Sequence, residues 1–446
     1  MTQKEFLRDL RRGLGSAVIE IEATHNPCQY KDIVLRCCLK DIGYDPQSEG
    51  TKGNYLYSAI CALGAKDDFE GTIIDAFTKR LEHHLFQQLC DILCNYMYDG
   101  SGKARAALKT KYQSLYNQLL RQRSFPFKYC EREQFEYLMI CAVDAGKWAA
   151  FKGCAADVGS IILKRKDDAC SAYDWFYGHC ENLFGEGRIA KYLSEASQKS
   201  EEIKAFADAV NSLEKTRKAN ASQRAELNVT LESYIAQAME YDKESRTRMN
   251  MIAMRFSRQG TEEDFVELAS IITAAQSDEE RAKMLRVFRY RDFPGDISGL
   301  LEYAESGCEQ LQNNALSALE RIKDHRVHDL AIKFIAAGNI DAGLPLLKEN
   351  WCKQDEPLIR RQILSSRKVT HETQMNIQSI YTKHRSKNCG DILEHVYRNG
   401  PCGFCRWGIV ESMWKSRVLS EKILEECLHD SYDETRKFAR KIIKRK

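Results

Sequence analysis

The amino-acid sequence predicts an all-α fold built from helical hairpins. Apolar residues recur at spacings of three and four along nearly the whole chain, the spacing that places them on one helix face. The alternation of apolar and polar residues that marks a half-buried strand is nearly absent. The chain has only 7 prolines in 446 residues, so few helix interiors are interrupted.

Composition indicates a compact, soluble protein with no overall attraction to polyanions. Charged residues make up 29% of the chain and hydrophobic residues 43%, which is typical of globular proteins. Lys plus Arg number 67 against 64 Asp plus Glu, so the net charge of +3 gives no global attraction to nucleic acid or acidic lipid. Charges near the N-terminus and the lack of a long apolar stretch predict a cytoplasmic protein without membrane association. Many of the 17 cysteines lie on apolar stripes and are expected to be buried thiols in a reducing compartment.

The first predicted domain, residues 1–185, consists of short amphipathic helices. Two helices are predicted at 30–39 and 55–63, separated by a polar loop from Gly43 to Gly53. Further helices are predicted at 85–98, 103–121, 131–145 and 148–163. Their short polar or glycine-bearing turns indicate helical hairpins.

A charged helical connector is predicted at residues 186–259. This segment is rich in Glu, Lys, Ala and Gln and has sparser apolar positions. The composition favours one or two long solvated helices that join the two halves of the chain.

The third predicted domain, residues 260–446, carries a repeated pattern. An acidic turn, an Arg and a helical apolar stripe follow one another at 277–282, 355–360 and 431–436. The three copies are separated by about two repeat lengths of the HEAT and armadillo class. A fourth, weaker copy covers 309–322, and Asp324-His325-Arg326-Val327 then begins a partner helix.

The segment from Asn314 to Ile335 resembles the HEAT-like repeats of bacterial proteins, and the resemblance extends over residues 260–446. It implies helical hairpins stacked into an α-solenoid, with the aspartate capping the next helix and the arginine bonding to a neighbouring repeat. The segments 44–50 and 401–406 are similar to features of a poorly characterised group of bacterial HEAT-like proteins. That resemblance implies a fold but no established reaction and no catalytic residues.

Cys402 and Cys405 form a C-x-x-C at the predicted start of a helix. A redox pair is one interpretation, but the βαβ setting of thioredoxin-like proteins is missing. A zinc site is a second, and it would recruit Cys389 or His395, because structural zinc takes four N or S donors. No second C-x-x-C follows, so we expect two packed cysteines and no stoichiometric zinc.

Two surfaces are candidates for partner binding. One is predicted to consist of residues from the two segments with family resemblance: Tyr44, Asp45, Gln47, Glu49, Cys402, Cys405 and Arg406. The 44–50 loop has a structural alternative, since Asp-Pro and Glu-Gly are also ordinary turn sequences. The other is the basic C-terminal helix, whose candidate phosphate contacts are Arg436, Lys437, Arg440, Lys441 and Lys444; a solvated capping helix is its structural alternative.

These observations favour a non-catalytic scaffold or adaptor that binds another protein. The chain has neither a G-x-x-x-x-G-K-[ST] phosphate loop nor a G-x-S-x-G motif nor H-E-x-x-H, and we expect no cofactor and no catalytic residue. The alternative is a nucleic-acid-binding HEAT-like protein with base-directed, glycosylase-like activity. A third hypothesis, a small helical enzyme, would require a closed pocket around Asp45, Glu49 and Tyr55. Asp433 is expected to cap the last helix, with a loss of about 1 kcal/mol on replacement by Ala.

Overall fold

The regular secondary structure is entirely helical over the residues that the structure describes. A computed structural model describes residues 1–121, 129–165, 173–226, 228–240, 246–366 and 368–445. These ranges contain 26 α-helices and no strand, which confirms the all-α prediction. None of the helices in these ranges is long and apolar enough to cross a lipid bilayer.

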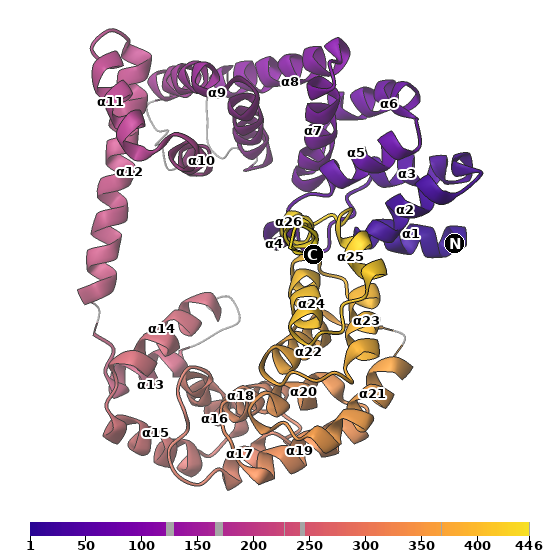
Figure 1. The fold of residues 1–446 in the computed structure, drawn as a ribbon. Helices are drawn as coiled ribbons and strands as arrows, with labels where there is room; N and C mark the ends of the chain where they lie inside the picture. The colour runs from indigo at the N-terminus through magenta and orange to yellow at the C-terminus, as the bar shows by residue number, and fades with distance from the viewer. Residues whose placement is uncertain (122–128, 166–172, 227, 241–245, 367, 446) are drawn as a thin grey trace. The chain divides into compact units, whose positions relative to one another are not determined.

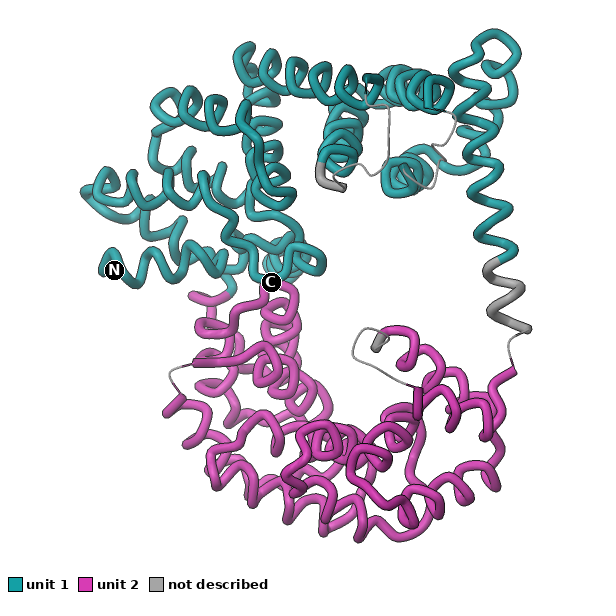
Figure 2. Tube along the Cα trace, turned by 180° about the vertical axis from the view of Figure 1, so that it is seen from behind, with its two compact units in different colours: residues 1–224, 424–446 teal, residues 225–423 magenta. Residues whose placement is uncertain are grey.

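The chain divides into two compact units (Figure 2). Unit 1 comprises residues 1–224 and 424–446, and unit 2 comprises residues 225–423. The predicted connector is therefore shared between the units, and the last residues of the predicted repeat domain belong with the N-terminal helices.

Unit 1 contains the first twelve helices, apart from the end of α12, and the last one. Their bounds are α1 (Gln3–Arg12), α2 (Gly15–Ala23), α3 (Lys31–Cys38), α4 (Pro46–Glu49), α5 (Gly53–Ala62), α6 (Lys66–Thr78), α7 (His83–Tyr98), α8 (Gly102–Arg121), α9 (Tyr129–Lys164), α10 (Asp174–Phe184), α11 (Glu186–Ala196), α12 (Glu201–Glu226) and α26 (Asp433–Ile443). The expected helices near 30–39, 55–63, 85–98 and 103–121 correspond to α3, α5, α7 and α8. Helix α9 is broken at Lys147, where φ is 52°, between the two helices predicted there.

The connector prediction of long solvated helices is only partly right. Helix α12 is long, but its first half buries Ile203, Phe206 and Val210 on one face. These residues lie three and four positions apart, so they form an apolar stripe that packs this half of α12 against the rest of unit 1.

The C-terminal segment packs against the beginning of the chain. The backbone N–H of Ser431 donates to the carbonyl of Gly13 at 2.8 Å. A Cβ atom at Gly15 would lie 1.8 Å from the carbonyl oxygen of Glu426, so this approach of two backbones requires glycine. The segment from Glu426 to Ser431, just before α26, is thus held to the start of the chain within unit 1.

Unit 2 consists of helices stacked on their next-but-one neighbours. Their bounds are α13 (Leu231–Met239), α14 (Arg246–Gln259), α15 (Glu262–Ala274), α16 (Asp278–Leu285), α17 (Ser298–Tyr303), α18 (Glu309–Leu319), α19 (His325–Ala336), α20 (Ile340–Asn350), α21 (Glu356–Ser365), α22 (His371–Lys383), α23 (Gly390–Asn399) and α24 (Gly403–Lys415); α25 (Glu421–Cys427) crosses into unit 1. Helices α16, α18, α20, α22 and α24 pack in one row, and α17, α19, α21 and α23 pack in a second row. Figure 1 shows the even-numbered row on the inner side of the curve of unit 2.

The pairing of helices differs from the predicted one. We expected the helix at 309–322 to pair with the helix that begins at Asp324. The structure instead packs α19 extensively against α20, and α17 against α18. The Asp324 turn therefore connects two successive pairs, because a helix packs most extensively on the neighbour that its own apolar stripe faces.

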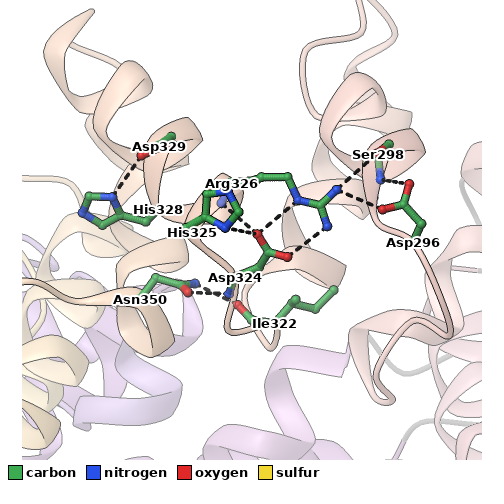
Figure 3. Close-up of polar contacts among 9 residues, drawn as sticks. All are labelled: Asp296, Ser298, Ile322, Asp324, His325, Arg326, His328, Asp329 and Asn350. Atoms are coloured by element: carbon green, nitrogen blue, oxygen red, sulfur yellow. Dashed lines mark hydrogen bonds and ion pairs between the residues drawn. The ribbon is translucent and has the colours of Figure 1, made fainter.

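Asp324 caps α19, as predicted, and it also anchors a polar network (Figure 3). Its carboxylate accepts from the N–H of Arg326 at 2.8 Å. The Arg326 guanidinium bonds to Asp324 at 2.9 Å and reaches Asp296, at 2.9 Å, before α17. Asn350 of α20 closes the same turn by accepting from the N–H of Asp324 at 2.9 Å and donating to the carbonyl of Ile322 at 2.8 Å. The aspartate and arginine thus have the structural roles that the sequence assigned to them.

Candidate functional site

The 44–50 loop contains an inward-facing carboxylate rather than a fully exposed polar surface. Glu49 ends the four-residue helix α4 and accepts from the backbone N–H groups of Tyr44 at 2.7 Å and Asp45 at 3.2 Å. Its carboxylate lies 3.4 Å from the ammonium of Lys52, and each side chain is only 2% exposed. Glu49 therefore stabilises its own loop, and of the predicted partner contacts only Tyr44 and Gln47 are well exposed.

The acid–base hypothesis at this loop receives no geometric support. The Tyr55 hydroxyl donates to the carbonyl of Leu14 at 2.7 Å and is buried. Lys52 also donates to the carbonyls of Arg11 at 3.0 Å and Ile42 at 3.1 Å. These polar groups connect the loop to neighbouring helices, which is a structural role.

Cys402, Cys405 and Arg406 lie in the interior of unit 2, and their predicted surface role is therefore wrong for this structure. Their exposed fractions are 1%, 3% and 0%. Cys402 is the N-cap residue of α24 and Cys405 lies in its first turn, as predicted. Helix α24 packs against α22, and this contact covers the first turn of α24.

The third donor at the C-x-x-C comes from His371, which the sequence analysis did not identify. Its Nε2 atom lies 3.1 Å from the Cys405 sulfur. Nε2 and the sulfur atoms of Cys402 and Cys405 all lie within 4.8 Å of one another. The sequence-based candidates, Cys389 and His395, are not members of this cluster.

The position of the C-x-x-C is set by an amide clamp from α22. The fully buried Gln374 donates from Nε2 to the carbonyl of Cys402 at 3.0 Å and accepts from its N–H at 3.2 Å. A Cβ atom on Gly400 would lie 2.5 to 2.7 Å from the Gln374 amide group, so only glycine admits this approach. The clamp holds the start of α24 against the first turn of α22.

Two further groups of metal-ligating side chains occur among the described residues. Cys90 and Cys94 on α7 approach Cys141 on α9, with 3.6 Å between the sulfur atoms of Cys90 and Cys141. Burial raises the pKa of Cys90 well above its usual range. Cys94 and Cys141 also line a mainly apolar cavity of about 260 Å³.

The other group joins His328 to the turn before α21. His328 Nε2 lies 3.1 Å from a carboxylate oxygen of Asp355, and that oxygen also accepts from the N–H of Cys352 at 2.9 Å. Asp355 therefore caps the short helix that begins after Cys352. This capping role is sufficient to explain why the three side chains lie close together.

The basic C-terminal helix is less available to phosphate than its sequence indicates. Lys437 bonds to Asp433 at 2.7 Å and to Glu434 at 2.7 Å. Arg436 bonds to the carbonyls of residues 430 and 431 at 2.6 and 2.8 Å. Of the predicted phosphate contacts, Arg440, Lys441 and Lys444 are the exposed cations that face solvent beyond these pairs.

The predicted cap at Asp433 is wrong. The N-cap of α26 is Tyr432, and Asp433 is the first helical residue. Asp433 bonds to Arg436 at 3.1 Å, and Asp278 bonds to Arg281 at 2.8 Å in the same relative positions at the start of α16. The repeated acidic-turn sequence thus produces an ion pair in the first helical turn at these two copies.

Comparison of the chain with protein-family models, with curated proteins and with solved structures found no match.

Proposed function

We propose that this protein is a non-catalytic cytoplasmic scaffold or adaptor that binds another protein along unit 2, through a HEAT-like α-solenoid surface. The single observation that carries the proposal is the stacking of alternate helices into two rows. Each added pair extends both rows, so such an architecture offers a surface much longer than one helix.

The even-numbered row is the proposed binding surface. It lies on the inner side of unit 2 and includes α16, α18, α20, α22 and α24 (Figure 1). An extended segment that follows this row meets side chains from several helices at once. Such a partner is favoured over a small molecule because the row is long and continuous.

The polar motif residues support a structural rather than a catalytic interpretation. Asp324 caps a helix and Arg326 bridges to Asp296, while Asn350 and Gln374 clamp backbone turns. Their donors and acceptors are used in joining one helix pair to the next. This pattern stabilises a repeat array and leaves the surface of each row to recognise a partner.

Nucleic-acid binding is the competing function, and no observation favours it specifically. Arg436 and Lys437 are engaged by neighbouring acceptors within α26 and its preceding turn. Exposed cations on a single helix give salt-sensitive and sequence-independent attraction rather than base recognition. A base-directed activity would require contacts to base edges or a pocket for an unstacked base.

A pull-down from native lysate with matched variants tests the proposal. Met375 on α22 is 41% exposed and Leu364 on α21 is 40% exposed, so they provide equivalent apolar side chains on the two rows. We expect Met375→Glu to reduce recovery of a protein partner at least tenfold and Leu364→Glu to leave it within twofold. The captured partner is identified by mass spectrometry and its recovery is compared before and after nuclease treatment.

Each alternative gives a different result. A protein that is retained after nuclease treatment and lost in Met375→Glu supports the scaffold proposal. Loss of all captured material on nuclease treatment, or equal effects of the two substitutions, contradicts it. Circular dichroism of both variants establishes that the helical content is unchanged.

A further inference from the structure

We propose that His371, Cys402 and Cys405 bind one zinc ion. The donor atoms are His371 Nε2 and the two sulfur atoms, which come together from the first turns of α22 and α24. The inference is independent of the scaffold function, and it reverses the sequence-based expectation of no stoichiometric zinc. The sequence analysis did not identify the third donor, because His371 lies on another helix.

The spacing of the three donors suits three corners of a tetrahedral zinc site, whose fourth corner is left to water or another exogenous ligand. Zinc–sulfur bonds of about 2.3 Å and zinc–nitrogen bonds of about 2.0 to 2.1 Å place tetrahedral donors about 3.6 to 3.8 Å apart. The three donor atoms lie within 4.8 Å of one another, and the closest nitrogen–sulfur distance is 3.1 Å. Side-chain rotations that move each donor by less than the length of a bond are sufficient for binding.

The start of α24 favours the thiolate form of the two cysteine ligands. Zinc binds thiolate sulfur, so binding releases to solvent any proton that a cysteine carried. Cys402 and Cys405 lie at the N-terminus of α24, where the helix dipole stabilises negative charge. Two thiolates and one neutral imidazole leave a zinc site without net charge, which is compatible with its burial.

The position of His371 is fixed by its own helix cap. Thr370 accepts from the N–H of Thr373 at 2.9 Å and donates to Asp341 of α20 at 3.0 Å. Gln374, one turn after His371, clamps the backbone of Cys402. Hydrogen bonds to the backbone beside each donor therefore hold the starts of α22 and α24 together, and such supporting contacts orient the ligands of metal sites.

The other two clusters are less suitable for zinc. At the Cys90, Cys94 and Cys141 cluster, hydrogen bonds from the two neighbouring thiols lower the pKa of Cys94 to about 4, whereas burial raises the pKa of Cys90 well above its usual range, so the cluster favours one thiolate and makes a second one costly. In the remaining cluster, the Asp355 oxygen nearest His328 already accepts a backbone N–H. Of the three clusters found among the described residues, the C-x-x-C cluster is the one that combines two cysteines at a helix start with an imidazole beside one of them.

The metal content of the full chain provides the first test. We expect about one zinc per chain by elemental analysis after removal of any affinity tag. After chelator treatment, titration with Co²⁺ should produce the near-ultraviolet charge-transfer absorption of cobalt–thiolate bonds. His371→Ala, Cys402→Ser and Cys405→Ser should each lose stoichiometric metal, whereas Cys389→Ser should retain it, because that buried thiol bonds to the Ser386 carbonyl outside the cluster.

Two additional variants keep the test decisive if a ligand substitution unfolds the chain. His371→Cys should retain zinc and increase the cobalt–thiolate absorption by about half, since it replaces imidazole with a third thiolate. Gln374→Ala should weaken Co²⁺ binding by about 10- to 100-fold, because it removes the hydrogen bonds that hold the backbone of the ligand Cys402. Absence of thiolate absorption in the wild-type chain would overturn the proposal. A disulfide between Cys402 and Cys405 trapped at lysis, or equal metal content in Cys402→Ser and wild type, would also overturn it.

Discussion

Replacement of Asp324 tests whether the acidic turn stabilises α19 through a helix cap. Asp324→Ala removes the acceptor of the Arg326 N–H at 2.8 Å. Loss of an N-cap costs about 1 kcal/mol. The accompanying ion pair with Arg326 is partly exposed, with side-chain exposures of 23% and 37%, so its loss adds only about 0.3 kcal/mol.

Two other variants separate the cap from the charge. Asp324→Asn retains a good capping residue and should cost less than about 0.5 kcal/mol. Asp433→Ala removes exposed ion pairs and a favourable first-turn charge but no cap, so we expect about 0.5 kcal/mol. The predicted order of destabilisation is therefore Asp324→Ala, followed by the other two.

Native-state hydrogen exchange measures the effect locally, which avoids assigning one unfolding free energy to a chain of two units. A loss of about 1.3 kcal/mol should accelerate exchange of the α19 amides by roughly tenfold, since 1.4 kcal/mol corresponds to a factor of ten. Equal acceleration by Asp324→Asn would refute the capping argument. A larger effect of Asp433→Ala on α26 would show that position 433 contributes more than its exposed pairs.

Two further predictions concern buried charges in unit 1. Burial raises the pKa of Glu136 from 4.5 to about 7, so the native state retains a proton that the unfolded chain releases between these values, and stability falls as pH rises through this window. In Glu136→Gln, about 3 kcal/mol of this pH-dependent loss of stability should disappear. The prediction is contradicted if the urea midpoints of the wild type and the variant change with pH in the same way between pH 4.5 and 8. Lys52→Met removes the ammonium beside the buried Glu49 carboxylate and should destabilise unit 1 by about 3 to 5 kcal/mol. In thermal unfolding, the double variant Lys52→Met with Glu49→Gln should recover part of the lost stability. If Lys52→Met alone is as stable as the wild type, the pair has no role in stability.

The class of fold and many helix positions follow from local sequence. Spacing of apolar residues identified α3, α5, α7 and α8, and it separated the two parts of α9 that meet at Lys147. The cap at Asp324 was also predictable, because an N-cap bonds to backbone groups only two or three residues away. Such features depend on contacts that are close in the sequence.

Assignments that depend on the precise first helical residue were less successful. Asp278 and Asp433 share the acidic-turn pattern with Asp324, but each lies one position inside its helix and pairs with an arginine instead. Asp324 both caps α19 and pairs with Arg326, whereas an aspartate one position inside its helix keeps only the ion pair. Local sequence does not show whether an aspartate is the N-cap or the first helical residue, because an aspartate is favourable at both positions.

The partners of buried polar groups were decided by tertiary structure. Glu49 turns toward Lys52, although the loop sequence is equally compatible with exposed carboxylates. His371 meets Cys405 because α22 and α24 stack as next-but-one neighbours, and no local spacing records this meeting. Periodicity along the chain determines which face of each helix is apolar, whereas the packing of those faces determines which distant side chains come within bonding distance.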